Sequence, residues 1–313
     1  MTELYYPEGH IIDTPENKEH LSNLCALEYA MNAGLILEAN ASLCDSNHNL
    51  LVDLGEFKAT IPRLEAAYSI DGSETRDIAI ITRVGKPVCF KIIAIDKSSS
   101  VPEIILSRRS AQAECFEKYI SKLASGDIID AKVTHIEPFG CFCDIGCGII
   151  SLLPVDCISV SRISSPKERF SPGDYIKCAV KQNDRHSGRI TLTHKELLGT
   201  WEENAENFSA GETAAGIIRS VEPYGIFVEL APNLAGLAEW CDNASPGQSA
   251  AVYIKSIIPE KMKIKLVIVD SHFSSAPVKK PKYFIDKGHI DMWQYSPYGC
   301  EKIIFTDFSD GIQ

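Results

Sequence analysis

Two stretches of this chain repeat each other at a fixed spacing. Residues 137–145 (EPFGCFCDI) are matched by residues 222–230 (EPYGIFVEL), and 222 − 137 gives a spacing of 85 residues. The match continues without a gap from Gly126 against Gly211 to Pro154 against Glu239. Similarity at one spacing over this length indicates a repeated structural unit. We therefore expect several similar modules rather than one large core.

Each full copy has the strand pattern of a small barrel. In the middle copy, alternating and apolar runs predict five short strands, at residues 126–136, 141–145, 149–153, 175–181 and 189–193. Five strands in about 70 residues, with a polar excursion between the third and the fourth, fit the five-stranded Greek-key barrel called the OB-fold. In such barrels, strands two and three form the usual nucleic-acid face.

A weaker copy precedes these two. Residues 53–55 (DLG) align with residues 144–146 (DIG), but His48 and Leu51 stand where the other copies have aromatic residues. The additional run at residues 77–82 (DIAIIT) predicts an extra strand in this copy.

Helices are expected at the start of the chain and between the copies. Thr14 and Pro15 suit the N-cap and first position of a helix, whose apolar face would comprise Leu21, Leu24, Cys25 and Met31. Docking on its own domain is the more common use of such a face, and binding a partner is the alternative. Connecting helices are predicted within residues 108–123 and 194–208.

The C-terminal segment follows a polar, proline-containing stretch at residues 271–282, which reads as a linker. Trp293, Tyr295 and Tyr298 lie close together beyond it. Docking onto the third copy and an additional surface for stacking RNA bases are the two interpretations of this tail.

Aromatic residues are expected to project from both full copies. Phe139 would stand at the tip of a turn and Phe142 on the outward side of strand two, with the cysteines around Phe142 pointing inward. Tyr224 and Phe227 repeat this pair. Nucleobases would cover such rings, because stacking on an aromatic side chain contributes about 1–3 kcal/mol per base. The alternative is that neighbouring repeats or linkers cover the rings.

Basic and polar residues of the middle copy are expected near its last hairpin. They comprise Lys177, Lys181, Arg185 and Arg189, placed around Asp184 and His186. Arginine can bind phosphate or stack on a base, and an aspartate can accept a hydrogen bond from a base amino group. The formal charge of −11 argues against a chain-wide polycation. Residues 126–196 nevertheless contain 9 Lys+Arg against 9 Asp+Glu, so this copy repels a polyanion least.

Cysteine spacing favours reduced thiols. The 11 cysteines are scattered and odd in number, which is unlike a disulfide framework. Cys141, Cys143 and Cys147 could suggest zinc, but the first two replace aliphatic residues of the other copy, and no His/Cys cluster completes four ligands. We expect neither a metal nor a cofactor. Neither a phosphate-binding glycine loop nor a Gly-x-Ser-x-Gly elbow occurs, so an enzyme is not expected.

Several of these residues resemble a known family. Residues 139–144 (FGCFCD), Asp184 with Arg189, and residues 197–201 (LLGTW) are similar to the RNA-binding domain first described in bacterial small-subunit ribosomal protein S1. The resemblance spans about residues 31 to 270, and tandem copies resemble the short forms found in clostridia-like bacteria. It implies that Phe139, Phe142, Asp184 and Arg189 contact RNA.

The resemblance also implies differences between the copies. Pro154 stands where the family often has a histidine. In the third copy Tyr224 and Phe227 remain, Lys263 replaces Arg189 and the hairpin loses its aspartate, so this copy is expected to bind more weakly or differently. The first copy is expected to be a structural or protein-docking module.

The expected architecture is mainly β, with tandem five-stranded OB-fold barrels, short helical linkers and an N-terminal helix. The expected segments are an N-terminal extension with a helix (1–30), a divergent OB-type domain (31–110), a helical linker (111–125), an OB-type RNA-binding domain (126–196), a helical linker (197–210), a third OB-type domain (211–270), and a linker with a C-terminal tail (271–313).

The expected function is binding of single-stranded RNA or mRNA in translation, with the 30S ribosomal subunit as a further partner. The start of the chain lacks a basic region followed by an apolar run, and no long apolar stretch occurs, so a cytoplasmic protein without membrane contact is expected. A regulator of mRNA or of its decay, and a protein-interaction scaffold, are the alternatives.

Overall fold

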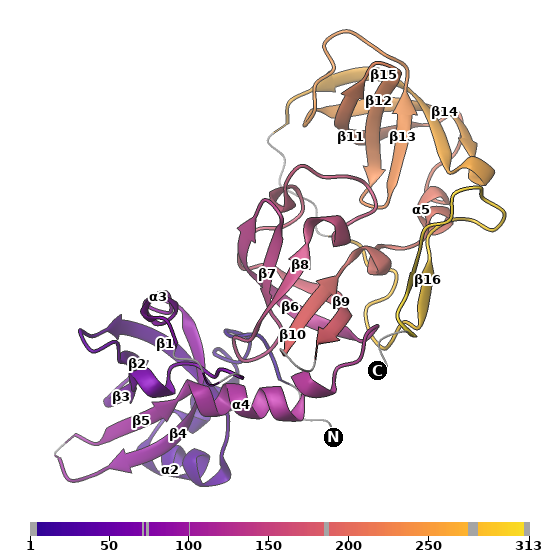
Figure 1. Cartoon of the computed structure of the whole chain (residues 1–313). Coiled ribbons are helices and arrows are strands. Elements are labelled where there is room, and N and C mark those ends of the chain that lie inside the picture. The colour runs from indigo at the N-terminus through magenta and orange to yellow at the C-terminus, as the bar shows by residue number, and fades with distance from the viewer. Residues whose placement is uncertain are drawn as a thin grey trace.

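The computed structural model describes residues 5–70, 72, 75–99, 101–184, 188–274 and 281–309. The chain folds into three closed five-stranded barrels, which follow one another from the lower left to the upper right of Figure 1. All three have the same strand order, in which the third strand pairs with the fifth in parallel and the other pairs are antiparallel. The expected mainly β fold of tandem OB-type barrels is therefore confirmed.

The strands of each barrel alternate between buried and exposed residues, so that each barrel encloses its own apolar core. The first barrel contains β1 Leu37–Cys44, β2 Leu50–Leu54, β3 Phe57–Ile61, β4 Pro87–Asp96 and β5 Glu103–Ser107. The middle barrel contains β6 Ile128–Glu137, β7 Gly140–Asp144, β8 Ile150–Pro154, β9 Tyr175–Asp184 and β10 Arg189–Thr193. The third barrel contains β11 Thr213–Glu222, β12 Gly225–Ala231, β13 Leu234–Ala238, β14 Ser249–Ile258 and β15 Lys263–His272.

The expected N-terminal helix is two helices, α1 Pro15–His20 and α2 Leu24–Ala33. Thr14 caps the first as predicted, but Asn23 starts a second helix by accepting the amide hydrogen of Ala26. This restart rotates the apolar face, so the buried side chains are Leu27 and Ala30, whereas Cys25 is exposed. The predicted apolar face is wrong at that cysteine.

The extra strand predicted at residues 77–82 is also wrong. Residues Asp77–Ile81 form the short helix α3, of which only Ile80 is buried. The barrel is already closed by pairing of β3 with β5, so a sixth strand has no free edge to join.

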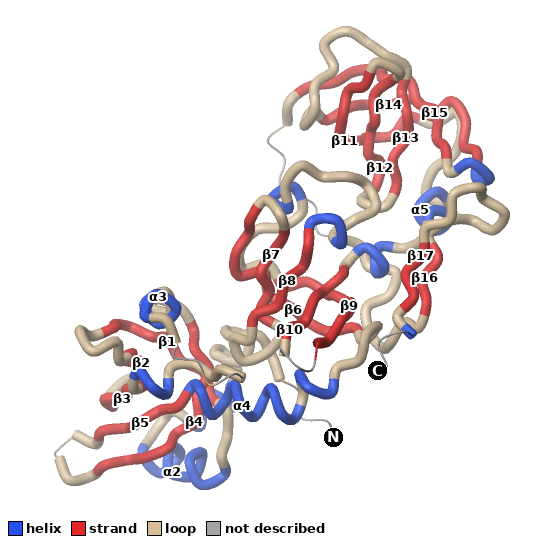
Figure 2. Tube along the Cα trace, viewed as in Figure 1, coloured by secondary structure: helices blue, strands red, loops and turns tan. Residues whose placement is uncertain are grey.

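The two connectors differ from each other. The first is a helix as expected, α4 Arg108–Lys118, which runs from the first barrel toward the middle one and is followed by a 3₁₀ turn at Ile120–Lys122 (Figures 1 and 2). The second is a 3₁₀ turn at Lys195–Leu198 and then the short helix α5 Trp201–Ala205. Gly199, with φ of 81°, separates the two and corrects the prediction of one continuous helix. None of the helices in the described part of the chain has the length and apolar character to cross a bilayer.

The C-terminal segment docks onto the middle barrel and α5 as well as onto the third barrel. It contains the strands β16 Met292–Gln294 and β17 Phe305–Asp307, which lie beside α5 and the middle barrel in Figure 2. Ile290 and Gly126 share a backbone hydrogen bond, and the Tyr295 hydroxyl donates to the carbonyl of Asn233. Trp293 and Tyr295 are buried, so this part of the tail is packing surface rather than a stacking surface.

The joint between the first and middle barrels is a buried polar cluster built around the N-terminal segment, residues 5–13. The Glu8 carboxylate accepts from Arg108 at 2.6 Å and 3.0 Å, and from the amide of Cys89 on β4 at 3.1 Å. The Glu8 amide donates to the Asp144 carboxylate at 2.8 Å. Although burial would raise the pKa of Glu8, the Arg108 guanidinium beside it holds that pKa below its ordinary value.

The joint between the middle and third barrels is built in a similar way. The Glu229 carboxylate accepts from Arg169 of the middle barrel at 2.6 Å and from Arg219 of its own barrel at 2.8 Å. Fully buried Asn233 accepts from the amide of Val160 and donates to the carbonyls of Lys195 and Gly199. Because 144 + 85 is 229, the acidic position at the end of strand two contributes to a joint in both full copies.

Candidate nucleic-acid interface

The turn between β6 and β7 presents Phe139 to solvent. Glu137 pairs with Gly140, which leaves Pro138 and Phe139 as a two-residue loop, and the Phe139 side chain is 55% exposed. A Cβ atom at Gly140 would lie 2.5 Å from the carbonyl oxygen of Leu153. The glycine that follows the aromatic residue is therefore required by the close approach of β8.

Phe142 stands beside Phe139 on the outer surface of β7. Its neighbours Cys141 and Cys143 are buried in the core, as the alternation predicts. The two phenylalanine rings meet edge to face, with centroids 6.0 Å apart and planes at 89°. Cross-strand pairing places His135, Leu152 and Thr191 in one outward row with Phe142.

His135 was not among the predicted site residues. Its ring stacks on Phe142 at 6.3 Å, and its Nε2 lies 2.8 Å from the Glu137 carboxylate. Only the register of β6 against β7 could have indicated it, since the 85-residue repeat has Ser220 at this position.

Arg189 lies on the same outer surface as this row. It is two residues before Thr191 on β10 and pairs across the hairpin with Asp184. The structure therefore brings Arg189 and Asp184 together and places the arginine on the face that contains Phe142. Arg185 and His186 lie outside the residues that the structure describes.

The two lysines of β9 have different surroundings. Lys181 reaches across the end of the barrel, with its Nζ 3.2 Å from the sulfur of Cys157, beyond the end of β8. Lys177 instead pairs with Asp130 at 2.6 Å on the β6 side, next to Tyr283 of the tail. Lys177 does not reach the hairpin, because six residues of an extended strand separate it from Asp184.

The third barrel repeats the ring geometry. Tyr224 is 69% exposed, and its ring meets Phe227 at 6.1 Å with planes at 85°. Lys263 pairs across its hairpin with Ile258, just as Arg189 pairs with Asp184. The cation is thus kept in position while the carboxylate is replaced by an apolar side chain.

Two further residues of the third barrel belong to this face and were missed. Lys255 occupies the irregular position on β14 that Lys181 occupies on β9, and it pairs with Glu239 at 3.0 Å. Trp240 follows Glu239 and is exposed. The ungapped sequence match ends at Glu239, so it reaches neither residue.

The first barrel lacks the ring pair at the equivalent positions. Leu51 is exposed in a row with Leu43 and Thr60, and the His48 Nδ1 lies 3.7 Å from the Asp77 carboxylate. An imidazole in contact with a carboxylate and an aliphatic side chain offer no pair of aromatic faces for stacking.

The cysteines of the middle barrel are core residues. Burial raises the pKa of Cys141 to about 12, which keeps this thiol protonated at neutral pH. Within the described ranges, no group of three His, Cys, Asp or Glu side chains is placed to hold a metal ion.

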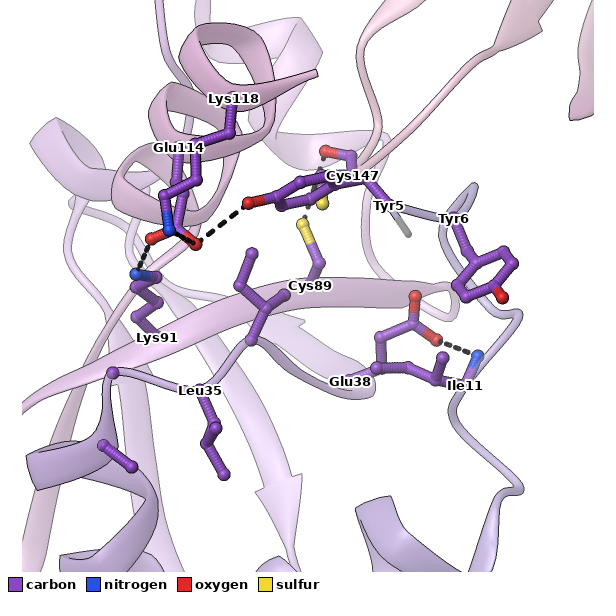
Figure 3. Close-up of a pocket in the computed structure, with 13 residues that line it drawn as sticks. Tyr5, Tyr6, Ile11, Leu35, Glu38, Cys89, Lys91, Glu114, Lys118 and Cys147 are labelled. Carbon is purple, nitrogen blue, oxygen red and sulfur yellow. Dashed lines mark hydrogen bonds and ion pairs between the residues drawn. The ribbon is translucent and has the colours of Figure 1, made fainter. Parts of the chain in front are cut away.

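A cavity of about 360 Å³ lies where the N-terminal segment meets the first barrel, and Figure 3 shows its walls. Its charged groups are paired with protein atoms. Glu114 contacts Lys91, Lys118 and the Tyr5 hydroxyl, and Glu38 accepts from the amides of Gly9 and Ile11. The cavity therefore reads as part of the joint rather than as a ligand site.

The Glu38 carboxyl makes this joint sensitive to pH. Burial raises the pKa of Glu38 from its ordinary value of 4.5 to about 7. A raised pKa in the folded protein stabilises the fold below about pH 4.5, and that contribution is lost as the pH rises through about 7. The shift corresponds to at most about 3 kcal/mol.

We expect the free energy of opening of the N-terminal segment to fall between pH 5 and pH 8, and to fall less in Glu38→Gln. Hydrogen-exchange protection factors of the Gly9 and Ile11 amides measure this, since they are already corrected for the intrinsic effect of pH on exchange. The same fall in the wild-type chain and the variant would show that Glu38 is not the titrating group.

The middle barrel, and a larger part of the chain, are similar in sequence to known proteins. The model of the family described as "S1 RNA binding domain" matches residues 122–195. A protein named small ribosomal subunit protein bS1 from Staphylococcus aureus strain COL is 29% identical over 235 residues, which cover 70% of this chain and 58% of that protein. Another of the same name from Leuconostoc lactis is 31% identical over 157 residues, or 49% and 36% of the two chains. This chain thus spans somewhat more than half the length of the Staphylococcus relative.

Among solved structures, a multidomain protein with nucleic acid binding domains from Streptococcus pneumoniae TIGR4 is 13% identical. The match covers 78% of this chain and 76% of that protein's chain, with a TM-score of 0.26, which is too low to support an inference.

Proposed function

We propose that this chain, which contains an S1 RNA-binding domain at residues 122–195 and is related to small ribosomal subunit proteins bS1, binds single-stranded RNA on the outward face of its middle barrel. The observation that supports this most directly is the exposed edge-to-face pair of Phe139 and Phe142, with Arg189 on the same surface.

The chemistry of this face suits unpaired bases. Each ring offers a surface on which a base can stack, at about 1–3 kcal/mol per base, and a base within a duplex has its faces already covered. Arg189 supplies a cation for phosphate or for a second stacking contact, and Asp184 can accept from a base amino group. The contact set we propose is Phe139, Phe142, Asp184, Arg189 and Lys181, with Arg185 and His186, which follow Asp184 in the sequence. Lys177 remains a candidate only through its position on β9.

The wider role we propose is mRNA binding in translation at the small ribosomal subunit, in the cytoplasm and without a catalytic reaction. Sequence similarity to proteins named small ribosomal subunit protein bS1 supports it. The domains we propose are a divergent OB-type domain at residues 31–110, an RNA-binding OB-type domain at residues 126–196 and a third OB-type domain at residues 211–270. Helical linkers at residues 111–125 and 197–210 join them, and an N-terminal extension (1–30) and a C-terminal tail (271–313) flank them. The first barrel serves as a structural or protein-docking module, because it has Leu51 where the others have a ring.

A titration of the full chain with a fluorescently labelled, unstructured RNA oligonucleotide tests this proposal. We expect saturable binding to the single strand and much weaker binding to a duplex of the same length. The logarithm of the affinity should fall only gently with the logarithm of salt concentration, because few phosphates are neutralised. The control is a DNA oligonucleotide of the same sequence, which tests the preference for RNA. Absence of binding to any single strand would overturn the proposal and favour a protein-interaction role.

A further inference from the structure

Trp240 lies at the end of the third barrel that also presents Tyr224. Strands β12 and β13 are antiparallel, and Ile226 pairs with Ala238, so the start of β12 and the end of β13 lie together. Tyr224 immediately precedes β12, and Trp240 follows β13 by two residues. Both side chains therefore emerge at the same end of this hairpin.

The tryptophan is not needed to fill the core. Its side chain is 60% exposed, whereas Trp201 and Trp293 are 2% and 5% exposed. In the middle barrel the equivalent residue is Val155, because Leu153 pairs with Cys141 as Ala238 pairs with Ile226, and Val155 and Trp240 each follow two residues later. The small side chain of Val155 is half-buried at the end of β8. A barrel of this kind thus closes without a large ring here. The indole instead adds to the exposed apolar residues Tyr224 and Leu237 of the same hairpin, and grouped exposed apolar residues mark binding surfaces.

Cations accompany the aromatic residues on this face. Leu237 pairs with Phe227 on one side and with Lys265 on the other, which continues the outward row toward β15. Lys263 lies two residues earlier on the same strand and is also exposed. Lys255 neutralises Glu239, the acidic residue directly before Trp240. A polyanion approaching the rings therefore meets Lys263 and Lys265, and the carboxylate of the residue directly before Trp240 is already paired with Lys255.

We propose that Trp240 stacks an unpaired base of a single-stranded nucleic acid, which makes Tyr224, Phe227, Leu237 and Trp240, with Lys263 and Lys265, a second binding face on the third barrel. The inference rests on the proposed function and extends it to a residue without an aromatic counterpart in the middle barrel. The indole is the largest aromatic surface of any side chain and emerges at the hairpin end that presents exposed Tyr224, on a barrel with the exposed lysines Lys263 and Lys265. This combination suits a base on a phosphate backbone. With Trp240 as an additional stacking side chain, the third barrel would contact more bases of the nucleic acid than Tyr224 and Phe227 do, although its hairpin lacks the aspartate.

Tryptophan fluorescence of the full chain tests this directly. The probe is an unlabelled, unstructured RNA oligonucleotide. We expect it to quench the emission of the wild-type chain, because Trp240 is the exposed member of the three tryptophans. In Trp240→Phe the quenching should disappear, while the emission of Trp201 and Trp293 confirms that the fold is intact.

Affinity measurements complete the test. We expect Trp240→Ala to weaken binding of an oligonucleotide long enough to reach both barrels by about tenfold, in line with one stacked base, and Trp240→Phe to recover most of that loss. The matched control is Tyr298→Ala, which removes a ring that is 99% exposed on the C-terminal segment and should leave affinity unchanged.

The outcomes separate this inference from the proposed function. If the wild-type chain binds RNA but shows neither quenching nor a loss in Trp240→Ala, the third-barrel face is refuted while the middle-barrel function stands. If the wild-type chain binds no single strand at all, both are refuted. Quenching that persists in a Phe139→Ala/Phe142→Ala variant at higher RNA concentration would support a separate site on the third barrel.

Discussion

Replacing Phe139 and Phe142 together with alanine should remove most of the affinity for single-stranded RNA. The two rings lie 6.0 Å apart on the outer surface of the middle barrel and can hold two bases between them and Arg189. At about 1–3 kcal/mol for each base, the double variant should bind at least about 30-fold more weakly. The measurement is the same oligonucleotide titration at constant salt. Both side chains point away from the core, so the barrel should remain folded.

The matched control for that variant is the double substitution His48→Ala/Leu51→Ala. These residues occupy the equivalent positions of the first barrel, where no ring pair is present. Affinity for RNA should stay within about twofold of the wild-type value, a difference of roughly 0.4 kcal/mol. Equal affinity of the Phe139→Ala/Phe142→Ala variant and the wild-type chain would show that RNA binds elsewhere. A comparable loss in the control would give the first barrel a role that we do not assign to it.

Replacing Arg108 with methionine should destabilise the joint between the first and middle barrels by about 3–5 kcal/mol. Arg108 and Glu8 are both about 5% exposed and share two hydrogen bonds, so the substitution leaves a buried carboxylate without its main cation. Asp144 lies next to it, and its own pKa is raised to about 7 by burial and by the negative charge of Glu8. The carboxyl groups of Glu8 and Asp144 would then lie close together without the positive charge of Arg108 to offset their negative charges.

Chemical denaturation at neutral pH, followed by circular dichroism, measures this loss. The matched control is Arg109→Met, because Arg109 is the next residue along α4 and exposes its side chain. That variant should cost at most about 1 kcal/mol, as expected for an exposed ion pair. Similar stabilities of the two variants would mean that the buried pair contributes no more than a surface contact. Protonation of Glu8 in the Arg108 variant would appear as partial recovery of stability at low pH.

The barrels and their aromatic rings could be predicted because the signals are local. Alternation with a period of two places Phe142 outside and Cys141 inside without any knowledge of the partner strand. The two-residue turn at Pro138 and Phe139 likewise depends only on consecutive residues. Predictions failed where a local pattern had two solutions. The apolar run at residues 77–82 was predicted to be a strand, but a short apolar run also fits a helix, and the closed barrel has no free edge for another strand.

The composition of the candidate site depended more on tertiary structure. Both Lys177 and Lys181 were expected near the last hairpin, but Lys177 pairs with Asp130 on the β6 side, and only Lys181 reaches the end of β8. His135, Lys255 and Trp240 join the two faces through strand register and through proximity at a hairpin end. A repeat spacing along the sequence cannot encode those relations across strands.

The repeated barrel, its outward ring pair and the cation that accompanies it could be derived from the amino-acid sequence alone, because period, turn and spacing are properties of neighbouring residues. The role of the repeated acidic position, in contrast, depends on how the barrels pack against their neighbours. Asp144 and Glu229 share a place at the end of strand two, yet one accepts from the N-terminal segment and the other from Arg169 of the preceding barrel. Their burial and partners arise from contacts between segments far apart in the chain, and those contacts form only when the barrels pack together.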